Sequence, residues 1–182
     1  MTFPAEYEIL FSKNLHFAWC GMGEEHIMEL SLDAFMARDA REVCSWRYPA
    51  PYDIYNEPDW DEVVRLGWEM ADPAARREEF RSLKADGVLA GFVHLHRQAD
   101  CVMLGMGLRP DLCGLGLGAH AMALALAEAA RRYPGVPLRL EVRTFNDRAR
   151  KCYEKAGFSA VDRHTRATPL GEGEFFLMEK TD

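Results

Sequence analysis

The sequence lacks the marks of a secreted, zinc-binding or membrane-spanning protein. Its five cysteines are widely spaced and contain no C-x-x-C pair, so they indicate neither a disulfide framework nor a zinc site. No basic, apolar leader opens the chain, and His120 and Glu128 interrupt the longest apolar run, residues 119–130. We therefore expect reduced thiols, no export signal, no membrane span and a cytoplasmic location. The cysteines are Cys20, Cys44, Cys101, Cys113 and Cys152.

Positive charge is also scarce. The chain has 22 Lys and Arg against 29 Asp and Glu, which gives a formal net charge of −7. This balance argues against nucleic acid or an anionic membrane as a partner, and it is compatible with a cationic substrate. Internal repeats and low-complexity tracts are absent as well. With 182 residues and 48% hydrophobic content, the chain suits one compact domain with a sizeable core.

A glycine-rich junction joins an apolar strand to a long alanine-rich helix. Gly114, Gly116 and Gly118 alternate at this junction. Glycines there let backbone N–H groups face an anion, and the first turn of the helix adds unpaired donors and the positive end of its dipole. The spacing is neither the G-x-G-x-x-G of a Rossmann site nor the G-x-x-x-x-G-K-[ST] of a P-loop. The junction therefore predicts a cradle for a phosphorylated cofactor.

The same segment resembles the acyl-CoA-binding motif of the GNAT superfamily of N-acetyltransferases, P-x-x-[QR]-G-x-G-x-[GA]. Pro110 and the three glycines are in register, and Cys113 stands where the family usually has Gln or Arg. Residues 140–158 reproduce a second GNAT pattern, L-E-V-x-x-x-N-x-x-A-x-x-x-Y-x-x-x-G-F. The resemblance is close over residues 101–158, looser from about residue 27, and does not cover the first 25 or so residues.

This resemblance implies an α/β (α+β) GNAT fold. Such a fold has a mixed, mostly antiparallel sheet of six to seven strands with a central parallel pair, flanked by about four helices. We expect residues 26–182 to form a single acetyltransferase domain, with residues 1–25 as an N-terminal extension. In that extension, alternation over residues 7–11 and 15–19 predicts a hairpin that ends at residues 21–23. This hairpin would cover an edge of the sheet or a partner subunit, so a homodimer is one of the alternatives that the sequence allows.

Periodicity and turn signals predict the elements of the domain. We expect helices at 39–46, 58–70, 117–133 and 147–156, and strands at 27–33, 77–84, 88–97, 101–108, 138–144, 159–168 and 174–180. The helix at 117–133 is apolar on nearly every side, so it should be buried against the sheet. It connects strands 101–108 and 138–144 by a right-handed crossover, which makes these two strands parallel. In GNAT folds such strands splay apart, and pantetheine lies between them.

The resemblance implies acetyl-CoA as the acyl donor. Its pyrophosphate would meet backbone N–H groups of residues 113–119, and the developing oxyanion would meet a backbone N–H of residues 106–108. Asn146 would cap the second motif helix and reach the pantetheine arm. The expected cofactor contacts are Met106, Leu108, Cys113, Gly114, Leu115, Gly116, Leu117, Gly118, Ala119, Asn146, Ala149 and Tyr153.

Direct attack of a neutral amine on a thioester needs a base, donors for the oxyanion and an acid for the leaving thiolate. The resemblance places Tyr153 near the CoA sulfur as the general acid. Glu141, twelve positions earlier, is the base we favour, as in the GNAT enzymes that acetylate the N-terminal alanine of ribosomal proteins. Its apolar neighbours in the strand would partly desolvate the carboxylate.

Two other readings of the reactive residues remain open. His94 and His96 lie on one face of a strand and are a competing base, since imidazole titrates near neutral pH. We expect no metal on this pair, because the sequence identifies no third ligand, and Cys101 and Cys113 are unsupported candidates for one. Cys113 as a nucleophile is the weaker alternative, because the direct reaction needs no covalent acyl-enzyme.

The acceptor side is predicted from an unusually aromatic segment. Residues 46–56 resemble the W-x-Y-x-x-P-Y-x-x-Y-N segment of a subgroup of uncharacterised GNAT proteins, and in the fold this loop borders the acceptor pocket. Its side chains would hold a cationic amine by cation–π contacts and hydrogen bonds, or would simply cover the core. The expected substrate contacts are Tyr52, Asp53, Tyr55, Asn56, His94 and His96.

The sequence thus predicts an enzyme that moves an acetyl group from acetyl-CoA to a primary amine. A small-molecule acceptor is favoured, because a peptide acceptor needs an open groove and the aromatic loop is bulky. The alternatives are a protein N-terminal acetyltransferase and a CoA-binding sensor or interaction module without turnover. A Rossmann reductase is weaker still.

Overall fold

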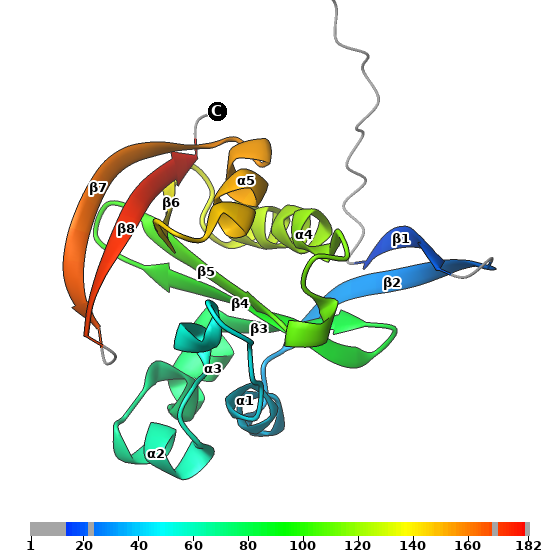
Figure 1. Cartoon of the computed structure of the whole chain (residues 1–182), viewed down its shortest axis with the longest axis horizontal. Coiled ribbons are helices and arrows are strands. Elements are labelled where there is room, and N and C mark those ends of the chain that lie inside the picture. The colour runs from blue at the N-terminus through cyan, green and yellow to red at the C-terminus, as the bar shows by residue number, and fades with distance from the viewer. Residues whose placement is uncertain (1–13, 22–23, 169–170, 181–182) are drawn as a thin grey trace, which may run out of the picture.

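The computed structural model describes residues 14–21, 24–168 and 171–180, and its centre is a mixed β-sheet (Figure 1). The strands are β1 Asn14–Gly21, β2 Glu24–Ala34, β3 Phe80–Ala85, β4 Val88–Arg97, β5 Val102–Leu108, β6 Leu138–Arg143, β7 Phe158–Thr168 and β8 Gly171–Lys180. They lie in the order β1-β2-β3-β4-β5-β6-β8-β7. Only β5 and β6 are parallel neighbours among these described strands.

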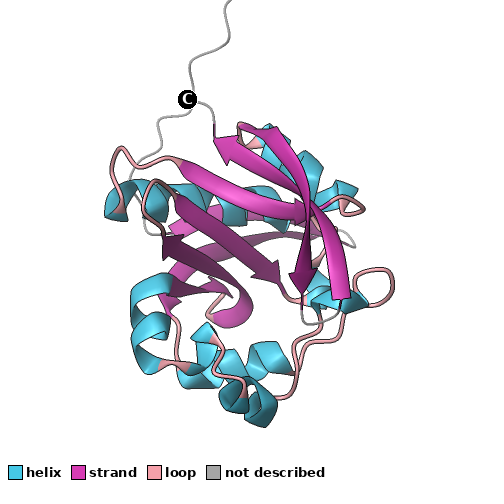
Figure 2. Ribbon diagram, turned by 90° about the vertical axis from the view of Figure 1, so that its left-hand side faces the viewer, coloured by secondary structure: helices cyan, strands magenta, loops and turns pink. Residues whose placement is uncertain are grey.

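Helices cover both faces of the sheet (Figure 2). The α-helices are α1 Ala37–Cys44, α2 Trp60–Arg65, α3 Pro73–Glu79, α4 Leu117–Arg132 and α5 Asp147–Lys155. The 3-10 turns are η1 Asp53–Tyr55, η2 Glu69–Ala71 and η3 Pro110–Leu112. Helices α1 to α3 lie on one face and α4 on the other, with α5 beside α4 (Figure 1). No helix in the described ranges is long and apolar enough to cross a bilayer.

Strand β4 separates two apolar cores, because successive side chains of a strand point to opposite faces. Val93 and Leu95 are fully buried in the core that contains Met122 of α4. Phe92 faces the other side and packs in the aromatic core around Phe80. The same alternation places the side chains at 94 and 96 on the face of α1 to α3.

The expected fold class is confirmed, and the strand count is higher by one. The described sheet has eight strands because β1 pairs with β2 along its whole length and extends one edge. Of the predicted hairpin, residues 15–19 lie in β1 and pair with β2. Its other half, residues 7–11, lies outside the described residues. Within the described residues the α-helices number five in place of about four.

Two predicted elements need correction. The expected helix at 58–70 ends at Arg65, because Gly67 takes a positive φ of 67° just beyond it. The expected strand at 77–84 begins only at Phe80. Asp72 and Pro73 follow the predicted helix in the sequence and start α3: the Asp72 carboxylate accepts a 2.7 Å hydrogen bond from Ala74 N, and Pro73 occupies the first helical position.

Helix α4 packs against the sheet as expected, but only one face of it is buried, although its sequence is apolar on nearly every side. Its buried face consists of Leu117, Ala121, Met122, Leu124, Ala125 and Ala129. Alanines form much of the opposite face and are exposed: Ala119, Ala123, Ala127 and Ala130. An exposed alanine has a small apolar surface, so apolar composition alone overstated the burial.

Candidate active site

A wedge opens in the sheet between β5 and β6. The two strands pair only at Val102 with Leu138 and at Met103 with Arg139. Beyond these pairs no ladder joins them, and β6 continues against β8. The parallel strands therefore splay apart and leave the edge of β5 unpaired along a gap.

The unpaired edge of β5 carries backbone donors. Arg109 N donates a 2.8 Å hydrogen bond to Ala90 O on the β4 side. Because backbone groups of alternate residues point to opposite sides of a strand, those of Met106 and Leu108 point into the gap. In agreement, Leu108 O accepts a 2.6 Å hydrogen bond from the Tyr48 hydroxyl across the gap. Met106 and Leu108 thus offer N–H groups where the sequence predicted the oxyanion donor.

The glycine-rich junction closes one end of the gap. Gly114 and Gly116 have φ values of +86° and +87°, a left-handed conformation that favours glycine. Gly116 is the N-cap of α4, so the unpaired N–H groups of a 16-residue helix begin at this loop. The backbone therefore has the form of an anion cradle.

A cavity of about 770 Å³ is lined by the glycine loop, the gap and the aromatic loop. Leu115 and Leu117 do not line it: Leu115 is 40% exposed, and Leu117 is buried in the core. The other expected cofactor contacts all line the cavity, namely Met106, Leu108, Cys113, Gly114, Gly116, Gly118, Ala119, Asn146, Ala149 and Tyr153.

The cavity is lined by more basic than acidic side chains, although the chain as a whole is acidic. On α5, Arg148, Lys151 and Lys155 line it without an ion pair to any residue in the described ranges, since the ion pairs of this helix involve Arg150. The lining cations are Arg143, Arg148, Lys151, Lys155 and Arg166, and the lining carboxylates are Glu57 and Glu141. An anionic ligand would be stabilised beside α5.

Tyr153 lies on α5 and is 9% exposed. Asn146 caps this helix, as expected, because its Oδ1 accepts a 3.1 Å hydrogen bond from Ala149 N. Burial raises the pKa of Tyr153, and Cys152 and Tyr55 add smaller effects in the same direction. The phenol therefore keeps its proton at neutral pH, as a general acid requires.

Glu141 is fully engaged by neighbouring side chains. Its Oε1 lies 3.1 Å from His164 Nε2, and its Oε2 accepts a 2.8 Å hydrogen bond from Arg166 Nε. The residue lines the cavity. Both carboxylate oxygens nevertheless have partners from β7, which the sequence could not indicate.

The aromatic loop, residues 46–56, is held across the gap by hydrogen bonds. Asn56 Oδ1 accepts a 2.6 Å hydrogen bond from Tyr48 N, which closes the loop on itself. The Tyr55 hydroxyl accepts a 3.0 Å hydrogen bond from Asn146 Nδ2, which joins the loop to α5. Tyr55 and Asn56 both line the cavity. Their polar groups are thus also used to hold the loop in place.

Tyr52 and Asp53 lie outside the residues that line the cavity. Tyr52 stacks on Tyr55, with ring centroids 6.5 Å apart, and the Arg148 guanidinium lies 4.4 Å from its centroid. Asp53 is exposed at the start of η1. The structure therefore brings two of the four predicted loop contacts into the cavity and uses Tyr52 as a packing residue.

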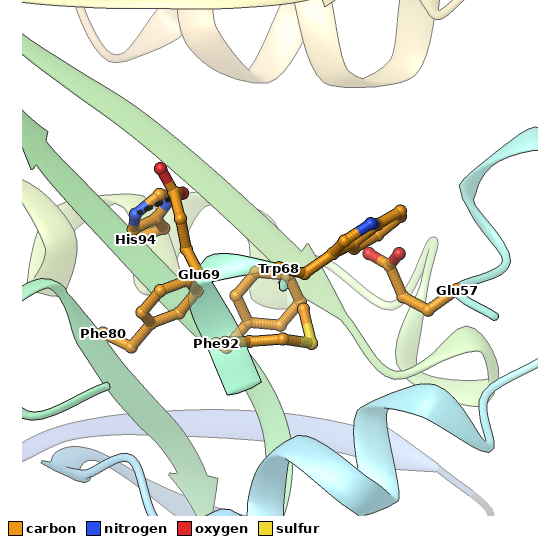
Figure 3. Close-up of a pocket in the computed structure, with 7 residues that line it drawn as sticks. Glu57, Trp68, Glu69, Phe80, Phe92 and His94 are labelled. Carbon is orange, nitrogen blue, oxygen red and sulfur yellow. Dashed lines mark ion pairs between the residues drawn. The ribbon is translucent and has the colours of Figure 1, made fainter. Parts of the chain in front are cut away.

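Glu57 was not predicted, and it is a carboxyl group that lines the cavity. Burial raises its pKa from 4.5 to about 7. No hydrogen bond or ion pair joins its carboxylate to another side chain in the part of the chain that the structure describes. Figure 3 shows this carboxylate directed toward Trp68. A carboxylate that titrates near neutral pH in a cleft is a candidate general base.

A second hollow of about 330 Å³ continues from the main cavity and shares Glu57, Trp68 and Phe92 with it. His94 lies at its far side, beyond the aromatic rings (Figure 3). His94 Nε2 and His96 Nδ1 each lie 2.9 Å from Glu79 Oε2. Both predicted histidines are therefore outside the main cavity and paired with a carboxylate.

The comparison with family models decides the family. The model described as acetyltransferase (GNAT) family matches residues 40–158, which include the glycine loop, the wedge and Tyr153. The chain belongs to the GNAT family of acetyltransferases. No curated protein sequence matches the chain.

Solved structures of other GNAT proteins share the fold. The ribosomal-protein-S18-alanine N-acetyltransferase from Escherichia coli superposes with a TM-score of 0.59 at 22% identity, over 83% of this chain and 92% of that one. A variant of spermidine N-acetyltransferase SpeG from Vibrio cholerae gives 0.61 at 18%, over 82% and 92%. Naa50 from Arabidopsis thaliana, in complex with the bisubstrate analogue CoA-Ac-MVNAL, gives 0.56 at 17%, over 84% and 99%.

The GNAT motifs gave a signal for the cofactor side but little for the acceptor side. Glu57 directly follows the aromatic segment, and this position is the sequence feature that could have indicated it as a site residue. Only its burial distinguishes it from an ordinary loop carboxylate. The sequence showed the spacing of His94 and His96. It did not show Glu79 beside them, because Glu79 comes close only where α3 leads into β3, which pairs with β4.

Proposed function

We propose that this GNAT protein transfers an acetyl group from acetyl-CoA to a primary amine by direct attack. The observation that carries the proposal is a single cavity in which the wedge, the glycine cradle and the buried Tyr153 meet. Pantetheine would lie along the unpaired edge of β5. Met106 or Leu108 would donate a backbone hydrogen bond to the thioester oxygen, where negative charge develops.

The phosphates of CoA would lie at the glycine loop. The N–H groups before α4 would bind them, and the unpaired cations of α5 would add charge. Arg148 also compensates for Cys113, which replaces the Gln or Arg of the motif. The Arg148 guanidinium is close enough to the Cys113 thiol to lower its pKa, against a larger rise from burial. The guanidinium would thus reach the loop from α5.

Tyr153 would protonate the thiolate that leaves. For the base, the sequence favoured Glu141, and both of its oxygens are bonded to other side chains. We propose Glu57 in its place, because its carboxylate has no partner among the described residues and its pKa of about 7 suits proton abstraction at neutral pH. Glu141 would then hold Arg166 and His164 at the wall of the cavity.

The acceptor would enter between the aromatic loop and Trp68. Glu57 would attract a cationic amine and then take its proton, and the rings of Trp46, Trp68 and Phe92 offer faces for cation–π contact. We favour a small-molecule amine, because the aromatic loop is tied across the gap. A protein N-terminus is the second candidate.

Calorimetry with acetyl-CoA, followed by thiol release with a panel of polyamines, aminoglycosides, amino acids and short peptides, tests the proposal. Saturable binding with release for one class establishes transfer and identifies the acceptor class. Binding without release for every class would instead favour a CoA-binding sensor. Absence of binding would refute the cofactor assignment.

A further inference from the structure

Four potential metal ligands meet at the far side of the second hollow. His94 and His96 come from β4, Glu79 ends α3, and Glu69 begins η2. One ligand atom from each lies within 4.8 Å of all the others. This cluster supplies the third and fourth ligands that the sequence did not identify, and neither of them is a cysteine.

The spacing of these atoms fits a tetrahedral ion. Zinc binds nitrogen and carboxylate oxygen at about 2.0–2.2 Å, so the ligands of a tetrahedral site lie about 3.4 Å apart. Glu79 Oε2 lies 2.9 Å from both His94 Nε2 and His96 Nδ1. Glu69 Oε2 lies 3.4 Å from His94 Nε2, and Glu69 Oε1 lies 3.9 Å from His96 Nδ1. The pairs with Glu79 are closer than the tetrahedral value and those with Glu69, measured from its two oxygens, are at or beyond it, so Glu69 and Glu79 must shift for one atom of each to bind the same ion.

The fold holds three of the four ligands in place. His94 and His96 share one face of β4, and Phe80 lies opposite His94 in the ladder and stacks on its ring at 4.0 Å and 9°. Because Phe80 follows Glu79 directly, this pairing also fixes the carboxylate beside the histidines. Glu69 is the more exposed ligand, with 56% of its side chain accessible, against 25% for Glu79.

The charge of the cluster also favours a cation. Neither Glu69 nor Glu79 forms an ion pair with a lysine or arginine anywhere in residues 14–21, 24–168 and 171–180. Two carboxylates therefore face two imidazoles without a permanent positive charge. A divalent ion would neutralise the two carboxylates.

We propose that His94, His96, Glu79 and Glu69 bind one divalent transition-metal ion of the zinc class. Two nitrogen and two oxygen ligands in a tetrahedral arrangement suit zinc better than magnesium, which prefers six oxygen ligands. The ion joins η2 to β4 and so fixes Trp68, the residue before Glu69, in the wall of the hollow (Figure 3). Metal binding does not depend on the proposed acetyl transfer.

Calorimetric titration of chelator-stripped, tag-free protein with Zn²⁺ tests the site. The expected result is one tight ion per chain for the wild type, and no comparable binding of Mg²⁺. His96→Asn and Glu79→Gln should each weaken it by about 100-fold or more, since even changes around a metal ligand cost about 10- to 100-fold. Glu78→Gln is the matched control, because Glu78 is exposed and pairs with Arg77 beside the cluster.

Thermal unfolding gives a second readout that is independent of turnover. Zn²⁺ should raise the Tm of the wild type and of Glu78→Gln, and should leave both ligand variants unchanged. All four proteins without metal should give cooperative unfolding, which shows that the variants fold. Absence of saturable zinc binding by the wild type would overturn the proposed site. So would a zinc affinity of His96→Asn and Glu79→Gln equal to that of the wild type.

Discussion

Replacing Glu57 by Gln should make the protein more stable at alkaline pH while reducing turnover. The folded protein holds the Glu57 carboxyl in a site that raises its pKa from 4.5 to about 7. Between these values the folded state binds a proton that the unfolded state releases. The favourable contribution of this carboxyl is therefore fully present below about pH 4.5 and is lost as the pH rises through about 7.

The magnitude follows from the size of the pKa change. One pKa unit corresponds to about 1.36 kcal/mol, so ionising Glu57 lowers the free energy of unfolding by about 3 kcal/mol at pH 8 relative to pH 4. Gln has nearly the shape of the neutral acid and does not ionise. The variant should therefore match the wild type at pH 4 and exceed it by up to about 3 kcal/mol at pH 8.

Urea unfolding of both proteins at several values from pH 4 to pH 8 measures this difference directly, because the other titrating groups cancel between them. Glu42→Gln, which removes an exposed carboxylate of α1, is the matched control and should show no such trend. A difference between the wild type and Glu57→Gln that is flat over this range would refute the burial argument.

The same variant tests the base. In the wild type, kcat/KM should rise with pH through an apparent pKa of about 7, and Glu57→Gln should lose this limb together with about 10²- to 10⁴-fold of turnover. Unchanged turnover with an unchanged pH profile would remove Glu57 from the mechanism and return the role to Glu141.

Three further substitutions test other parts of the structure. Tyr153→Phe should lower kcat by about 10²- to 10⁴-fold and leave acetyl-CoA affinity in calorimetry nearly unchanged, and full activity would exclude the acid role. Gly116→Val should abolish acetyl-CoA binding, whereas Gly135→Val, also at a positive φ but beyond the other end of α4, should destabilise the protein and still bind. Leu95→Ala should lower the free energy of unfolding by about 2–5 kcal/mol in urea, because Leu95 is fully buried; a loss below about 0.5 kcal/mol would contradict that.

Features that depend on short stretches of chain could be predicted. The cradle requires glycine at positive φ and a following helix, and Gly114, Gly116 and the periodicity of α4 are all local. Asn146 as the cap of α5 is local as well. The strand–helix–strand order fixed the parallel pair, because only a crossover joins parallel neighbours. Helix ends were mispredicted where one signal has two meanings, because an Asp-Pro pair can follow one helix or start the next, as Asp72 and Pro73 start α3.

The chemistry of the acceptor side depends on side chains that are distant in sequence. The pKa of Glu57 is raised by burial that the folded chain creates, and Glu141 is occupied by partners from β7. The spacing of His94 and His96 can be read from the sequence, but the carboxylates beside them belong to α3 and η2. Amino-acid sequence thus determined the fold class and the glycine cradle, which follow from local conformation. Only the tertiary structure decided which carboxylates are free, buried or paired, because desolvation and charge pairing depend on distances in space.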